Sequence, residues 1–146
     1  MKKIFCLFIV IAIAATIAGC TSSMSYTFNV GTGDKIVVKL DTSNGLSLSA
    51  KDPITVSRDE TDVSHIIFIE GDMYDDYASL ANTDENVNVL ESGEKDGNSY
   101  VFWNYGSEWN CVLFVNGSDT AVIIGNAISE DSARECLNSL TFSVAD

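Results

Sequence analysis

The sequence predicts an α+β domain: an antiparallel β-sheet flanked by two helices, at about residues 72–81 and 129–140. Short segments of alternating apolar and polar residues recur between turn residues, which is typical of antiparallel strands. Helical spacing replaces this alternation in two places. Strands, a helix, further strands and a final helix form the order expected of an α+β domain. With 146 residues and one proline, the chain is expected to hold a single such domain, over residues 26–146.

The first half of this domain is predicted to consist of strands joined by tight turns. Apolar residues alternate over residues 26–30 and 36–40, on either side of a glycine-containing turn, and predict a hairpin. Asn44-Gly45 is the strongest turn signal, because both residues tolerate positive φ. Residues 63–69 are dense in apolar side chains and predict a central strand that is buried on both faces.

The first predicted helix starts where the periodicity changes, after Gly71. Asp72 is suited to cap its N-terminus, and Met73, Tyr77 and Leu80 form an apolar stripe at helical spacing. Four further strands are then expected, over residues 87–91, 99–105, 109–115 and 120–126.

The last helix has the clearest signals. Ser129 is suited to cap it and acidic residues occupy its first turn. Its apolar face consists of Ala133, Cys136, Leu137 and Leu140. A short strand-like segment, residues 141–144, ends the chain.

The first residues read as a secretory leader. Lys2 and Lys3 precede an apolar run over residues 4–17. A basic start, an apolar stretch of this length and small residues after it are typical of a signal peptide. The run is too short for a stable helix across the hydrocarbon core of a membrane.

The end of this run, Ile17-Ala18-Gly19-Cys20, resembles the lipobox of bacterial lipoproteins. The resemblance implies that residues 1–19 are removed and that Cys20 is acylated, which anchors the protein on the extracytoplasmic side of a bacterial membrane. Residues 20–25 would then form a polar tether. The alternative is an ordinary signal peptide in which Cys20 is incidental.

The charge of the chain restricts its partners. The leader carries two of the eight basic residues and none of the 21 acidic ones, so the formal charge of −13 becomes −15 once the leader is removed. A domain this acidic repels phosphate backbones, which argues against nucleic-acid binding. It also avoids anionic headgroups, so membrane attachment is expected through the lipid anchor.

No motif indicates a catalytic residue, a cofactor or a metal site. His65 is the single histidine, and its alternation with apolar residues favours a structural position over a catalytic one. Acidic clusters could suit calcium, but none matches a twelve-residue calcium loop, and a solvated acidic surface is the simpler interpretation. These clusters lie at residues 59–62, 72–76 and 84–86. No carboxylate pair stands out for sugar hydrolysis.

Aromatic residues are concentrated over residues 100–109. Trp103, Tyr105 and Trp109 are the candidate ligand-binding residues, because exposed aromatic faces suit sugar rings or apolar peptides. The alternative is that both faces of this hairpin are covered and the rings belong to the core.

Cys111 and Cys136 are the thiols that remain once Cys20 is acylated. Export places them where a disulfide can persist, so they are candidates for one. The alternative is two separate buried thiols that act as small hydrophobic side chains.

The order of elements, closed by residues 132–142 (SARECLNSLTF), is similar to that of small PsbP-like domains. The resemblance implies an antiparallel sheet flanked by helices, and a role as a binding or assembly factor. We therefore expect a lipid-anchored, non-enzymatic binding or accessory protein whose partner is a glycan or a protein. The alternative is a small cell-envelope hydrolase that uses carboxylates.

Overall fold

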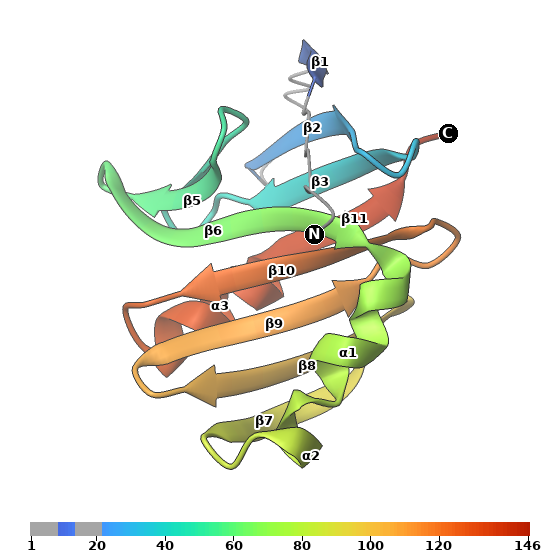
Figure 1. Ribbon diagram of the computed structural model, residues 1–146. Helices are drawn as coiled ribbons and strands as arrows, with labels where there is room; N and C mark the ends of the chain where they lie inside the picture. Colours follow the sequence, from blue (N-terminus) through green and yellow to red (C-terminus); the bar gives the residue numbers. More distant parts are fainter. Residues whose placement is uncertain (1–8, 14–21) are drawn as a thin grey trace.

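The computed structural model describes residues 9–13 and 22–146 and contains two antiparallel β-sheets (Figure 1). The structure is 56% strand and 16% helix, so the domain is mostly β. The predicted α+β class, with one sheet and two flanking helices, is wrong. Two sheets form because the N-terminal hairpin pairs with the C-terminal strand, which local periodicity does not reveal.

The smaller sheet has the strand order β1-β2-β3-β11, and the larger has the order β4-β5-β6-β10-β9-β8-β7. The strands are β1 (Ile9–Ile13), β2 (Ser23–Asn29), β3 (Lys35–Asp41), β4 (Leu46–Ser49), β5 (Ile54–Arg58), β6 (Thr61–Glu70), β7 (Val87–Lys95), β8 (Asn98–Tyr105), β9 (Glu108–Phe114), β10 (Thr120–Asn126) and β11 (Leu140–Val144). Because β2 begins at Ser23, three residues assigned to the tether by the sequence belong to the sheet.

The turn signals are confirmed, but one of them connects different sheets. Gly33 adopts a φ of 94° in the turn of the β2–β3 hairpin. Gly45 adopts a φ of 83° in the turn predicted at Asn44-Gly45. That turn leads from β3 in the smaller sheet to β4 in the larger one, so it starts a new sheet instead of closing a hairpin.

The main core lies between the inner face of the larger sheet, the smaller sheet and α3 (Glu130–Ser139). Phe28 of β2 packs on Phe68 of β6, with 5.5 Å between the ring centroids. The predicted N-cap of α3 is confirmed, since the backbone N–H of Ser132 donates to Ser129 Oγ at 3.1 Å. One face of α3 is buried, and it consists of Ala133, Cys136 and Leu137.

The prediction of one helix over residues 72–81 is wrong, because three short helical segments occupy this region. These are η1 (Gly71–Met73), α1 (Tyr74–Ala78) and α2 (Leu80–Thr83). Asp72 makes no capping hydrogen bond, and the Ser79 hydroxyl donates to the carbonyl of Asp76 at 3.0 Å. Serine that bonds local carbonyls competes with helix propagation.

These short helical segments cover one part of the outer face of the larger sheet. Tyr77 of α1 stacks on Trp103 of β8, with 6.4 Å between the ring centroids. Val101, Trp103 and Val112 form a second, smaller core beneath them. Among the described residues, none of the helices has the length and apolar character needed to cross a membrane.

Within the part of the chain that the structure describes, no element covers the part of the outer face on β6. Ile66 and Phe68 point into the main core, whereas the side chain of Ile67 between them is 50% exposed and His65 is exposed. The prediction that residues 63–69 are buried on both faces is therefore wrong. An antiparallel sheet can face solvent on one side, and α1 lies over β8 and β9 while α2 lies against β7, away from the exposed part of β6.

Candidate functional site

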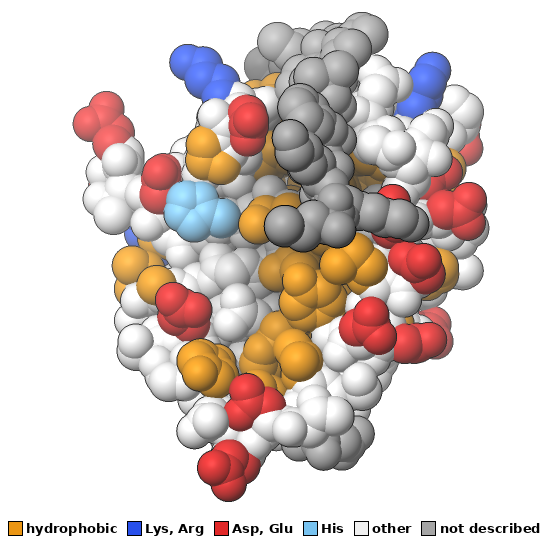
Figure 2. All heavy atoms as spheres, in the orientation of Figure 1, with side chains coloured by type: hydrophobic (Ala, Val, Ile, Leu, Met, Phe, Trp, Pro, Cys, Tyr) orange, Lys and Arg blue, Asp and Glu red, His pale blue; other side chains and the backbone are white. Residues whose placement is uncertain are grey.

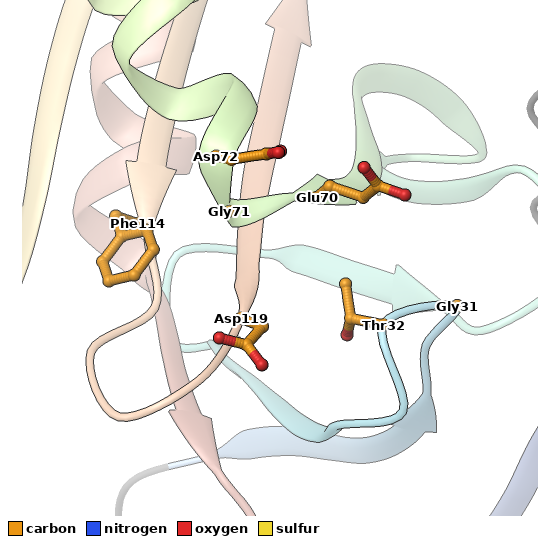
Figure 3. A pocket seen from close by; sticks show the side chains of 7 residues that line it. All are labelled: Gly31, Thr32, Glu70, Gly71, Asp72, Phe114 and Asp119. Carbon is orange, nitrogen blue, oxygen red and sulfur yellow. The ribbon is translucent and has the colours of Figure 1, made fainter. Parts of the chain in front are cut away.

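A shallow pocket of about 620 Å³ lies at the end of the domain where the β2–β3 turn, η1 and the β9–β10 turn meet (Figure 3). Segments far apart in the sequence form its wall. The lining residues are Gly31, Thr32, Glu70, Gly71, Asp72, Phe114 and Asp119.

Asp34 joins two of these turns. Its Oδ2 accepts hydrogen bonds from Thr120 Oγ1 at 2.7 Å, Thr32 Oγ1 at 3.0 Å and the backbone N–H of Asp119 at 2.9 Å. The Thr120 hydroxyl is the largest cause of a lowered pKa of the Asp34 carboxyl. Thr32 and Asp119 add to this effect, and partial burial opposes it. Asp34 is therefore an ionised, structural carboxylate that holds the smaller sheet against the larger one.

Replacing Asp34 by asparagine is expected to lower the free energy of unfolding by about 1 kcal/mol near pH 7, because charge-assisted hydrogen bonds are lost and solvent screens part of the effect. The folded-state pKa lies below the ordinary value of 3.8, so the carboxylate stabilises the fold above about that pH. Its contribution disappears as the pH falls through the lowered pKa. Urea unfolding of both proteins at pH 7 and pH 3 should show the difference shrinking at the acidic pH. A constant difference would contradict this role.

Gly71 is required by the close approach of two chain segments at the pocket. Its backbone N–H donates to the carbonyl of Asp119 at 2.7 Å. A Cβ at this position would lie 2.8 Å from Phe114 Cε2 and 2.9 Å from the carbonyl carbon and oxygen of Asp119. The missing side chain therefore lets η1 dock on the β9–β10 turn.

The chemistry of the pocket is that of an acidic surface. Glu70, Asp72 and Asp119 contribute carboxylates, and none of the described residues that line the pocket is a lysine or an arginine. Within residues 9–13 and 22–146, no group of three or more histidine, cysteine or acidic side chains is arranged to hold a metal ion. The pocket can attract cationic groups, and the aromatic side chain of Phe114 in its wall packs edge-on against Tyr74.

A second feature is an apolar surface on the outer face of the larger sheet, which we call the open face. It consists of Ile67 and Ile69 on β6 and Ile123 on β10; Ile67 is exposed and the other two are half-buried. Ile67 lies directly opposite Ile123, and His65 lies opposite Gly125. Figure 2 shows hydrophobic side chains gathered in the middle of this face, next to the histidine.

The three candidate ligand-binding aromatic residues do not form one surface. Trp103 is 5% exposed and lies beneath α1, whereas Tyr105 is 48% exposed at the end of the same strand. Trp109 packs from the opposite face against the main core. The structure therefore does not bring the three rings together on one exposed surface, because strand alternation places Trp103 and Trp109 on opposite faces of the sheet.

The disulfide expected between Cys111 and Cys136 is not formed. Both residues are free thiols that are buried in the main core. Burial is the largest cause of a raised pKa of each thiol. A raised pKa disfavours the nucleophilic thiolate, so these residues act as small core side chains. Cys20, the predicted lipidation site, lies outside the described residues.

Sequence reasoning missed a polar network between α3 and the edge of the larger sheet. Arg134 pairs with Glu91 at 2.6 Å and with Glu130 at 2.9 Å. Glu91 also accepts a hydrogen bond from the Tyr100 hydroxyl, which raises the pKa of Tyr100 to about 12. The guanidinium of Arg134 lies 4.8 Å from the ring centroid of Phe102. This network attaches α3 to β7 and β8. The sequence offers a signal for only one of its contacts, the pair of Glu130 and Arg134, because residues four apart lie side by side on a helix.

Comparisons with known proteins found no matching family model, no matching curated protein and no matching solved structure.

Proposed function

We propose that this chain is a lipid-anchored binding or accessory protein on the extracytoplasmic side of a bacterial membrane, and that its open face docks a partner protein. The observation that carries the proposal is the exposed aliphatic surface around Ile67 on an otherwise strongly acidic domain. Contiguous exposed apolar surface on a small domain marks interaction sites.

Aliphatic side chains favour a protein over a glycan as the partner. Stacking of a sugar ring uses exposed aromatic faces, and of the three candidate rings Trp103 is buried beneath Tyr77 and only Tyr105 is exposed. Ile67 is instead an exposed aliphatic residue beside Ile69 and Ile123, which are half-buried and pack against the second core, and it offers a surface for apolar side chains of a protein. The lipobox at residues 17–20 supports the anchoring part of the proposal.

The experiment places a photo-crosslinking amino acid at Ile67 in the full chain, produced in a bacterial host that lipidates its own proteins. Illumination of membranes from the native organism, mixed with this protein, should give one discrete adduct that mass spectrometry identifies. The matched control carries the same amino acid at Val144, which is also an exposed aliphatic residue but lies on β11.

The control at Val144 is expected to give no such adduct. An unlabelled competitor should reduce the Ile67 adduct, while an Ile67→Lys competitor should not. Equal adducts from both positions, or none from Ile67, would count against the open face as a docking surface.

A further inference from the structure

The presence of the leader decides which strand, β1 or β2, forms one edge of the smaller sheet. In the structure β1 pairs antiparallel with β2, with Val10 opposite Phe28 and Ile13 opposite Tyr26. All of β1 lies within residues 1–19, which the proposed function removes. We propose that in the mature chain, which begins at Cys20, the vacated edge of β2 pairs with β2 of a second copy of this chain. The inference rests on the proposed lipidation and leader removal.

The vacated edge lacks the features that normally prevent edge pairing. β2 has seven residues and contains no charge and no proline. By comparison, β7 carries Glu91, Glu94 and Lys95 and has an irregular register near Val89. The other edge strands, β4 and β11, have only four and five residues. Natural edges are usually protected by charges, bulges or shortness, and β2 has none of these.

The sequence of β2 fits a copy of itself. Its residues, SMSYTFN, alternate between polar and apolar, and the pattern is symmetric about Tyr26. Antiparallel pairing about that residue places Met24 opposite Phe28 and Ser25 opposite Thr27 of the second copy. Apolar residues then meet on the core side and hydroxyl residues on the solvent side, as cross-strand pairs prefer. The arrangement is an isologous twofold dimer.

Charge also favours this contact over others on the same molecule. The mature chain carries a net charge of −15, so most surfaces of two copies repel each other. The β2–β3 hairpin, residues 23–41, contains two acidic residues, Asp34 and Asp41, and two basic ones, Lys35 and Lys39, so its formal charge is zero. With no net charge, this hairpin is a part of the chain that a second copy can approach with little like-charge repulsion.

Membrane anchoring supplies the concentration that such a narrow contact needs. Two paired strands bury less area than a stable interface of roughly 1,000 Å² requires. Confinement on one membrane raises the effective concentration of the two copies. The three residues from Cys20 to Ser23 span at most about 11 Å, so each anchor holds its β2 near the lipid. A twofold axis normal to the membrane lets both anchors enter the same leaflet.

The experiment tests the predicted register by disulfide cross-linking in membranes. Two differently tagged full chains, Ser25→Cys and Thr27→Cys, are produced together in a bacterial host that lipidates its proteins, and a mild oxidant is added. We expect a mixed disulfide dimer that reduction removes, with loss of the signal when either variant is expressed alone. Cys111 and Cys136 are buried and should not contribute. The matched control pairs Ser143→Cys, on the opposite edge strand β11, with Thr27→Cys.

A dimer from the Ser143→Cys control, or none from the Ser25→Cys and Thr27→Cys pair on lipidated chains, would overturn the pairing. In a Cys20→Ser background the leader stays attached and β1 covers β2, so the mixed dimer should be lost. Amine cross-linking of the unmodified chain through the exposed Lys39 is a second, independent measurement of dimer formation.

Mass spectrometry of the N-terminal peptide separates the two proposals. A lipidated Cys20 without a dimer contradicts the pairing alone. A retained leader in the unmodified chain contradicts the proposed anchoring and the pairing together.

Discussion

Replacing Trp103 by alanine is expected to lower the free energy of unfolding by about 3–5 kcal/mol, the range for truncating a large buried aromatic side chain. The ring is 5% exposed and stacks on Tyr77 in the smaller core beneath α1. Its removal takes away the ring on which Tyr77 packs and leaves a cavity between β8 and α1. Chemical denaturation followed by circular dichroism measures the effect.

The matched control is Tyr105→Ala, two residues further along the same face of β8. Tyr105 is 48% exposed, so its truncation should change the free energy of unfolding by about 0.5 kcal/mol or less. Similar losses for both variants would contradict the assignment of Trp103 to the core and of Tyr105 to the surface.

Replacing Phe28 by alanine is also expected to lower the free energy of unfolding by about 3–5 kcal/mol. Here the loss arises from the contact between the two sheets. Phe28 is 1% exposed and packs on Phe68 across the main core. The smaller sheet meets the larger one through such side chains, so the variant should loosen β2 and β3 before the larger sheet. Amide hydrogen exchange should show protection falling first in those strands.

Val144→Ala is the control for this variant, because Val144 lies in the same sheet but is 37% exposed. It should alter stability and exchange only slightly. Uniform loss of protection over both sheets in Phe28→Ala would mean that the domain unfolds as one cooperative unit, against the expected order.

Two of the acidic residues, Asp34 and Glu91, have structural roles that the sequence does not indicate. The carboxylate whose pKa is lowered at the pocket, Asp34, binds two hydroxyls and one backbone N–H, and joins turns 86 residues apart. No clustering in the sequence distinguishes it from the other 20 acidic residues. Glu91 is similar, since its partners Tyr100 and Arg134 lie on β8 and α3.

The sequence by itself determined the local elements of this protein. Alternation placed the strands near their observed bounds, and Asn44-Gly45 marked a turn that Gly45 forms with positive φ. Ser129 marked the start of α3. Each of these features depends on interactions within a few residues, which is why a single sequence reveals them.

Only the tertiary structure decided which strands share a sheet and which faces are covered. The pairing of β3 with β11 joins segments a hundred residues apart and creates the second sheet. Coverage by α1 buries Trp103 but leaves Ile67 exposed, although both lie on the same face of the larger sheet. Alternation specifies that successive side chains point to opposite faces, but burial of a face depends on elements that pack there from elsewhere in the chain.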